Sequence, residues 1–119
     1  MMDAVQAAYE SAKGRLGRLT LDEFREVVKS FEVHGVEVDG KVAGALIVAG
    51  PEVHACVLPW AHGRWITKRL LRVFDDVVRK NGYARTSATT DAGRNFVERL
   101  GFKQCADGWW RKWGVLYGR

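Results

Sequence analysis

The sequence predicts an α/β fold: a mixed, mostly antiparallel central sheet with helices on both faces. An Asp39-Gly40 pair between two β-prone runs is typical of a two-residue hairpin turn. Two continuous apolar runs, residues 42–49 and 53–58, indicate strands that are covered on both sides. Helical spacing over residues 65–80 separates the second of these strands from a further β-prone segment, which predicts a parallel strand-helix-strand crossover.

Two short helices are expected before the sheet. Residues 4–13 carry apolar side chains at near-helical spacing, and Gly14 interrupts that spacing. A second helix is expected to begin at a capping box, in which the Thr20 hydroxyl and the Glu23 carboxylate bind main-chain N–H groups at the helix start. Its core face is predicted to hold four apolar residues, Phe24, Val27, Val28 and Phe31.

Strands and helices alternate in the second half of the chain. The long helix over residues 65–80 is expected to stop at Asn81-Gly82, because both residues tolerate a left-handed conformation. The remaining predicted elements are a strand at 83–89, a helix at 92–100 with Asp91 as its N-cap and Gly101 as its C-cap, and a closing hairpin of strands 102–106 and 109–116 around Asp107-Gly108.

Length and composition predict one globular domain. The chain has 119 residues, 47% of them hydrophobic and 28% charged. Within this domain, residues 1–32 are expected to hold the two N-terminal helices, and residues 33–119 the sheet and the region of the candidate site. The apolar runs are too short to cross a bilayer and charges interrupt the N-terminus, so we expect a soluble cytoplasmic protein. Cys56 and Cys105 lie in apolar segments and are expected to be buried free thiols.

The excess of positive charge points to an anionic ligand. Nineteen Lys and Arg against fourteen Asp and Glu give a net charge of +5. Cations at Arg64, Lys68, Arg69 and Arg72 begin the long helix, where the helix dipole favours acids. This order is favourable when a phosphate binds at the helix start. The alternative is that these cations only form a solvated face.

Over residues 36–113 the chain resembles the GCN5-related N-acetyltransferase (GNAT) superfamily. The matching features are the Asp39-Gly40 hairpin, the strand 53–59, the loop 60–64, the long helix, and the segment 95–102, which ends in Leu-Gly-Phe. The loop, which reads His-Gly-Arg-Trp, is most similar to that of small phage-encoded members. The resemblance implies the order of sheet elements described above.

The resemblance also implies a co-substrate and a reaction. Acetyl-CoA, without a metal, would lie with its pantetheine along Val57 and Leu58 as an added strand, and an amine would attack the thioester directly. A main-chain N–H near Val57 would contact the oxyanion. The cofactor-binding residues would be Val57, Leu58, His62, Gly63, Arg64, Trp65, Ile66, Thr67 and Thr90.

The loop departs from the family pattern (Arg or Gln)-x-x-Gly-x-(Gly or Ala). The pattern aligns with residues 62–67, so Trp65 and Thr67 replace the two small residues. The resemblance implies that the pyrophosphate of acetyl-CoA lies on the loop and helix start at residues 62–67. Either the indole of Trp65 fills this pyrophosphate site, or it points into the core and Gly63 provides the flexibility.

The acid and base positions also depart from the family. The tyrosine that acts as general acid in many members aligns with Val97, so Tyr117 is the candidate acid, with Tyr83 as an alternative. Glu52 is the carboxylate nearest to the usual base position, one residue out of phase along the strand. The catalytic candidates are therefore Glu52 and Tyr117.

The sequence contains two other patterns that are typical of binding sites. His54 and Cys56 share a strand face near His62, but no further ligands follow at zinc-site spacing, so no metal is expected. Aromatic and basic residues alternate along 109–113, which is also a pattern of single-strand nucleic-acid binding. We expect instead that these residues pack on the core or on a subunit partner; exposed tryptophans would favour nucleic acid or a protein interface.

Two functions therefore remain. The first is acetyl-CoA-dependent N-acetyl transfer to an unidentified amine. The second is a GNAT-like domain without catalysis, a structural or interaction protein such as a phage virion component. Coenzyme A is the expected ligand, and homo-oligomer or virion contacts are expected through the aromatic C-terminal strand. No nucleic-acid or membrane partner is expected, and the place of action is the host cytoplasm or the virion.

Overall fold

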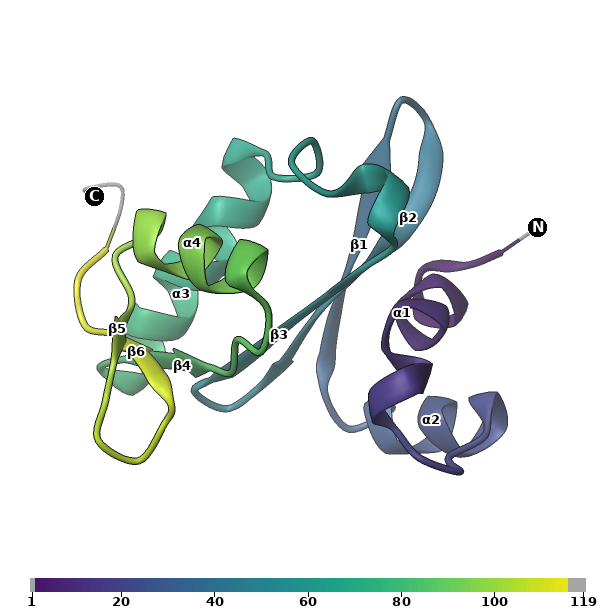
Figure 1. The fold of residues 1–119 in the computed structure, drawn as a ribbon, viewed down its shortest axis with the longest axis horizontal. Coiled ribbons are helices and arrows are strands. Elements are labelled where there is room, and N and C mark those ends of the chain that lie inside the picture. The colour runs from purple at the N-terminus through teal and green to yellow at the C-terminus, as the bar shows by residue number, and fades with distance from the viewer. Residues whose placement is uncertain (1, 116–119) are drawn as a thin grey trace. The chain divides into compact units, whose positions relative to one another are not determined.

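The computed structural model describes residues 2–115 as an α/β fold (Figure 1). The strands form a six-stranded sheet in the order β1-β2-β3-β4-β6-β5, mostly antiparallel, with β3 and β4 parallel. This confirms the predicted mixed sheet. The elements are α1 (Ala4–Ala12), η1 (Lys13–Arg15), α2 (Leu21–Val28), β1 (Glu32–Val38), β2 (Lys41–Ala49), β3 (Glu52–Val57), η2 (Pro59–Ala61), α3 (Lys68–Asn81), β4 (Ala84–Thr86), α4 (Asp91–Arg99), β5 (Lys103–Gln104) and β6 (Trp110–Lys112).

The chain divides into two compact units. The first unit comprises the chain up to Ala49 together with Ala55–Thr67, and the second comprises Gly50–His54 together with the chain from Lys68 onward. Strand β3 therefore contributes its first residues to the second unit and its last residues to the first. Within residues 2–115, no helix is long and apolar enough to span a membrane.

The first unit is built on the β1–β2 hairpin. Asp39 and Gly40 both have positive φ, 54° and 75°, which confirms the predicted turn. Helix α1 packs against β2 (Figure 1). The core between the two helices and the strands is apolar and holds Ala8, Ala12, Phe24, Val28, Ala45, Ile47 and Cys56.

Helix α2 begins at the predicted capping box but buries less than expected. Thr20 and Glu23 exchange both capping bonds, and Phe24 and Val28 are buried. The prediction for Val27 and Phe31 is wrong, because they are 49% and 38% exposed. The helix ends at Val28, so Phe31 lies beyond it, and only two residues one turn apart face the core.

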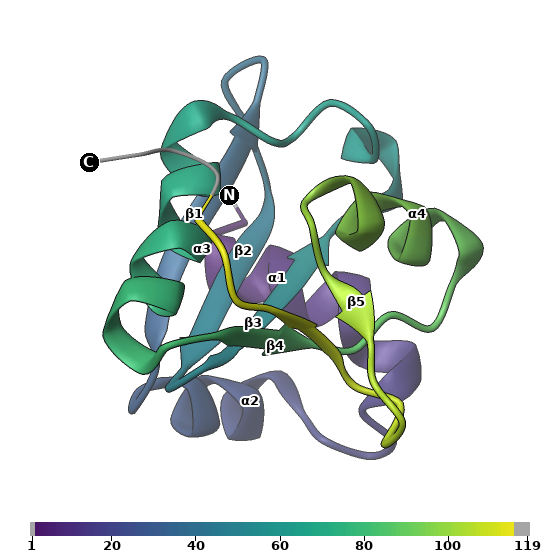
Figure 2. The ribbon, with the colours of Figure 1, turned by 90° about the vertical axis from the view of Figure 1, so that its left-hand side faces the viewer.

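The second unit is built on β4 and the β5–β6 hairpin. Helix α3 packs against β4 (Figure 2), and the rings of Phe74 and Phe102 meet edge to face at 6.0 Å. Alternation along the two strands buries one face, which holds Ala84, Thr86, Trp110 and Lys112. The predicted separation of Trp110 and Lys112 from Trp109 and Arg111 is confirmed, since the latter two are only half-buried.

Several boundaries differ from the prediction. Helix α3 begins at Lys68 rather than at residue 65, because Gly63 takes a φ of 82° and the Arg64 N–H closes a turn to Ala61 O at 3.0 Å. The chain thus remains non-helical through Thr67. The predicted stop is confirmed, since α3 ends at Asn81 and Gly82 has a φ of 84°.

The elements after α3 are shorter than predicted. Strand β4 covers three residues because only these pair with β6. The N-cap of α4 is Thr90, whose hydroxyl accepts a hydrogen bond from Gly93 N, so Asp91 is the first helical residue. Cys105 is half-exposed rather than buried, since it lies at the turn of the closing hairpin.

The turn of that hairpin also differs from the first one. The N–H of Gly108 donates to Cys105 O at 2.9 Å, and Gly108 alone takes a positive φ, 90°. The Asp107 carboxylate instead accepts from Trp109 N at 3.1 Å. An Asp-Gly pair therefore marks a turn in both hairpins but builds two different turns.

Candidate functional site

The loop that follows β3 has much of its main chain engaged in hydrogen bonds. Leu58 N donates to Ala43 O at 2.8 Å, which ties the loop start to β2. Three further N–H groups, those of Ala61, His62 and Arg64, donate to carbonyls three residues earlier at 3.0 to 3.1 Å. These amides are therefore engaged within the first unit.

Two side chains fasten the loop to its neighbours. His62 Nε2 lies 2.9 Å from Val57 O, and because a carbonyl only accepts, this nitrogen is the donor. Arg64 Nη1 lies 3.3 Å from Asp39 Oδ2 at the hairpin turn, with both side chains more than half exposed. The main-chain carbonyl of Val57 and the Arg64 cation, two predicted ligand groups, are thus held by residues of the same unit.

Trp65 takes the buried one of its two predicted orientations. Its side chain is 6% exposed, while Gly63 beside it provides the left-handed turn. Ile66 is half-buried and Thr67 is exposed. The indole therefore does not lie on the exposed surface of the loop, which displays His62, Gly63 and Arg64.

The start of α3, in the second unit, is cationic as predicted. Lys68, Arg69 and Arg72 are exposed, and no acid occurs in the first turn. Asp75 further along the helix is fully buried, so it does not belong to a solvated charged face. Arg64, in contrast, lies in the loop and not on the helix.

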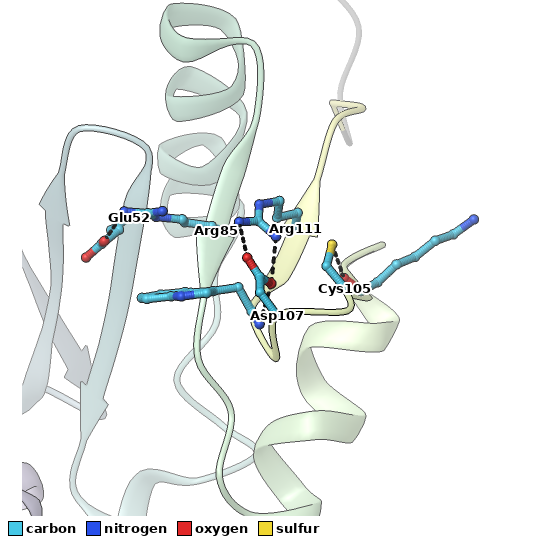
Figure 3. A network of polar contacts seen from close by, with 7 residues as sticks. Glu52, Arg85, Cys105, Asp107 and Arg111 are labelled. Carbon is cyan, nitrogen blue, oxygen red and sulfur yellow. Dashed lines mark hydrogen bonds and ion pairs between the residues drawn. The ribbon is translucent and has the colours of Figure 1, made fainter.

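Strand β3 begins with an acid held by two partners. Glu52 is the cross-strand partner of Arg85 on β4, and its carboxylate forms an ion pair with that guanidinium (Figure 3). The other carboxylate oxygen lies 3.2 Å from His54 Nε2. Because a carboxylate accepts hydrogen bonds, Nε2 carries a hydrogen, and in the neutral form of the ring Nδ1 then has the lone pair. The His54 side chain is 39% exposed.

The sequence reasoning singled out Glu52 but missed the roles of His54 and Arg85. The Glu-x-His spacing, which puts both side chains on one strand face, was the available signal for His54. Arg85 could be found only from the pairing of β3 with β4, thirty-three positions away in the sequence.

A second ion pair lies on the same side of the second unit. Arg111 binds Asp107 through two hydrogen bonds of 3.0 and 2.8 Å (Figure 3). These bonds, with the one from Trp109 N, lower the pKa of Asp107 to about 2. The guanidinium of Arg85, which pairs with Glu52, also lies over the ring of Trp109, 4.7 Å from its centre.

The remaining predicted residues are placed as follows. Thr90 uses its hydroxyl to cap α4, and Val97 is buried within that helix. Burial raises the pKa of the Cys56 thiol, so this thiol is not activated as a nucleophile. Tyr117 lies outside the described residues. Among residues 2–115, no three His, Cys, Asp or Glu side chains are grouped so that they could hold a metal ion.

Comparisons with protein-family models, with curated proteins and with solved structures gave no match for this chain.

Proposed function

We propose that the protein binds acetyl-CoA and transfers the acetyl group to an amine. The observation that carries this proposal is the arrangement of Glu52, His54 and Arg85 at the start of β3. Arg85 fixes the Glu52 carboxylate, the carboxylate fixes the tautomer of His54, and the His54 Nδ1 is left as a proton acceptor. A base oriented by a carboxylate is a common device for removing a proton from a nucleophile.

In this proposal His54 takes the proton and Glu52 is the positioning residue. The amine attacks the thioester carbonyl, a carbon–nitrogen bond forms, and the carbon–sulfur bond breaks. The proton lost by the amine passes to His54, and the coenzyme A thiolate leaves and is protonated from solvent. Sequence reasoning named Glu52 as the base; the ion pair with Arg85 and the bond to His54 favour the histidine.

The phosphates are assigned to the cations around the start of α3. Lys68 and Arg69 are exposed in its first turn. Arg64 precedes them in the sequence and belongs to the first unit, so it is tested separately below. Binding of the pantetheine along Val57 would require the loop to break two contacts, one from His62 to Val57 O and one from Arg64 to Asp39, and to replace them with contacts to the ligand. The second is an exposed ion pair, and such pairs contribute about 0 to 1 kcal/mol, so an anion can displace it.

Calorimetric titration with acetyl-CoA and with coenzyme A tests the proposal. We expect micromolar binding that Arg64→Glu weakens at least about tenfold, since the variant puts an acid where the pyrophosphate is assigned. Arg18→Glu, which changes another exposed arginine of the first unit, is the control and should leave binding unchanged. His54→Gln should keep binding and lose transfer to a panel of amines. Absence of binding at millimolar ligand would contradict the proposal.

A second candidate function is a structural or interaction protein with this fold and without catalysis. It is favoured by the hydrogen bonding of the loop after β3, where four main-chain N–H groups and the Val57 carbonyl are already engaged. Under this candidate, coenzyme A does not bind. Cross-linking in the native cell or particle should then recover a partner through the aromatic segment near Trp113, which is 57% exposed.

A further inference from the structure

One face of the second unit carries a row of cations. Strand pairing places Lys103 opposite Arg111 and Arg111 opposite Arg85, so three positive side chains stand side by side on β5, β6 and β4. The opposite face of β4 and β6 is buried, which leaves this row on the outward face. Like charges directly opposite one another destabilise a sheet, so the row requires compensation.

Two acids supply part of that compensation. Glu52 pairs with Arg85 and Asp107 pairs with Arg111, while Lys103 is exposed and forms no ion pair within residues 2–115. The face therefore keeps a net positive charge at its β5 edge.

The same face offers flat surfaces. The Arg85 guanidinium stacks on Trp109 at 4.7 Å from the ring centre, and its Nε is buried without a hydrogen-bond partner in the described part of the chain. Trp113 follows β6 directly, and alternation continued from the strand puts it on the side of Arg111; it is 57% exposed. We call Arg85, Lys103, Trp109, Arg111 and Trp113 the Arg–Trp face.

We propose that the Arg–Trp face binds single-stranded nucleic acid. Bases would stack on the Trp113 indole and on the Arg85–Trp109 pair, because every base has a π-face and stacking needs no particular sequence. Phosphates would contact Lys103 first and then the two arginines. A protein partner could also use tryptophan and arginine, but three cations in one row match a chain of phosphates better than a mixed protein surface.

The number of cations sets the expected salt dependence. For single strands, log K falls by about 0.7 per phosphate contact with each unit of log salt, so three cations give a slope no steeper than about −2. Stacking of bases on the tryptophans involves no ion pair, so the part of the affinity that it provides should not change with salt. A moderate slope with retained binding at physiological salt therefore distinguishes this face from a merely basic protein.

Fluorescence anisotropy with a labelled oligothymidylate of about 16 nucleotides tests the proposal. We expect Trp113→Ala to weaken binding about tenfold, and Lys103→Glu to weaken it severalfold and to reduce the salt slope by about 0.7. Both residues are exposed, so neither change should prevent folding. Neither residue belongs to the proposed acetyl-transfer site, so failure here leaves that proposal standing.

Matched variants in the first unit provide the controls. Trp60→Ala removes another exposed tryptophan, 44% exposed, and Lys41→Glu reverses another exposed lysine. Both should leave affinity within about twofold, as surface changes away from a site do. The proposal is overturned if the oligonucleotide does not bind, if duplex DNA of the same length binds equally well, or if the controls weaken binding as much. It is also overturned if no oligonucleotide binds and Trp113→Ala dissolves a self-associated form in sedimentation, since the face would then join two copies.

Discussion

The two units have interiors of different chemistry. The core cluster of the first unit holds three alanines, a valine, an isoleucine, a phenylalanine and a buried thiol. The second unit buries Asp75 completely, together with Lys112, Thr86 and the indole nitrogen of Trp110, for which no hydrogen-bond partner occurs in the described chain. One unit is therefore held by apolar packing, and the other also depends on compensated charge.

This difference changes what each unit tolerates. An apolar interior is sensitive to volume, because side chains are packed at crystal-like density and respond to each added atom. A charged interior is sensitive to the loss of one partner, because the remaining charge is left without compensation. Substitutions should therefore lower stability mainly by changing side-chain volume in the first unit and mainly by removing a charge in the second.

The largest effect is expected at Gly44 in the first unit. Its φ is 153°, and a Cβ there would lie 2.9 Å from Val57 Cα and 3.0 Å from Cys56 C, with Cys56 O closer still. These atoms are main chain and cannot rotate away. We expect Gly44→Ala to lower the free energy of unfolding by about 4 kcal/mol or more, measured by urea denaturation.

Gly14 is the matched control for Gly44. A Cβ at Gly14 meets nothing within 4 Å, and its φ is not positive. Gly14→Ala should therefore leave stability unchanged or raise it by about 0.5 kcal/mol, because alanine restricts the unfolded chain. Equal stability of the two variants would show that β2 and β3 do not approach as closely as the structure has them.

The second effect is expected at Lys112 in the second unit. Its side chain is 5% exposed, and the negative charge of Asp75 acts on it. Asp75→Asn should cost about 3 kcal/mol, because it removes the charge that partly offsets the burial of the Lys112 cation. The double variant Asp75→Asn with Lys112→Met should recover part of this loss. Lys103→Met, on the neighbouring strand but exposed, should change stability by less than about 0.5 kcal/mol.

The pH dependence of stability gives an independent test of the burial of Lys112. Burial lowers the pKa of Lys112 and the charge of Asp75 only partly offsets this. The folded state therefore releases the Lys112 proton before the unfolded state does, and stability should rise as the pH increases toward 10.5. Lys112→Met should lack this rise. If the difference in the free energy of unfolding between the wild type and Lys112→Met stays constant up to pH 10.5, the lowered pKa of Lys112 is contradicted.

Local patterns predicted the first unit more completely than the second. The Asp39-Gly40 turn and the Thr20–Glu23 capping box depend on neighbouring residues only, and both are confirmed. The error at Phe31 arose because apolar spacing continues past the end of α2, whereas Val27 lies within the helix but on its exposed side. The end of a helix depends on how the helix packs, and the spacing of apolar residues alone does not predict it.

The second unit depends on pairings between distant residues. Nothing in the sequence pairs Arg85 with Glu52 or Lys112 with Asp75, because register between strands and helix placement bring these residues together. The same applies to the site. The cationic start of α3 was readable from the sequence, whereas the engagement of His62 with Val57 O and the orientation of His54 by Glu52 were not.

The smallest effect is expected at Asp107, on the surface of the second unit. Its bonds to Arg111 and to Trp109 N lower its pKa from 3.8 to about 2, so the folded state holds its proton more weakly than the unfolded state. The stabilising contribution is thus fully present above pH 3.8 and is lost as the pH falls to about 2. Asp107→Asn keeps the acceptor for Trp109 N but removes the charge.

Asp107→Asn should lower the melting temperature by about 2 °C at pH 7, because the ion pair is exposed to solvent. The two proteins should then melt together near pH 2, where the wild-type carboxyl is protonated. Glu37→Gln, an exposed acid on β1, should leave the melting temperature nearly unchanged at pH 7. If the Asp107 difference persists at pH 2, the contribution comes from the turn geometry and not from the charge. The contrast between the units would then rest on Lys112 and Asp75 alone, the charged pair that lies in the interior.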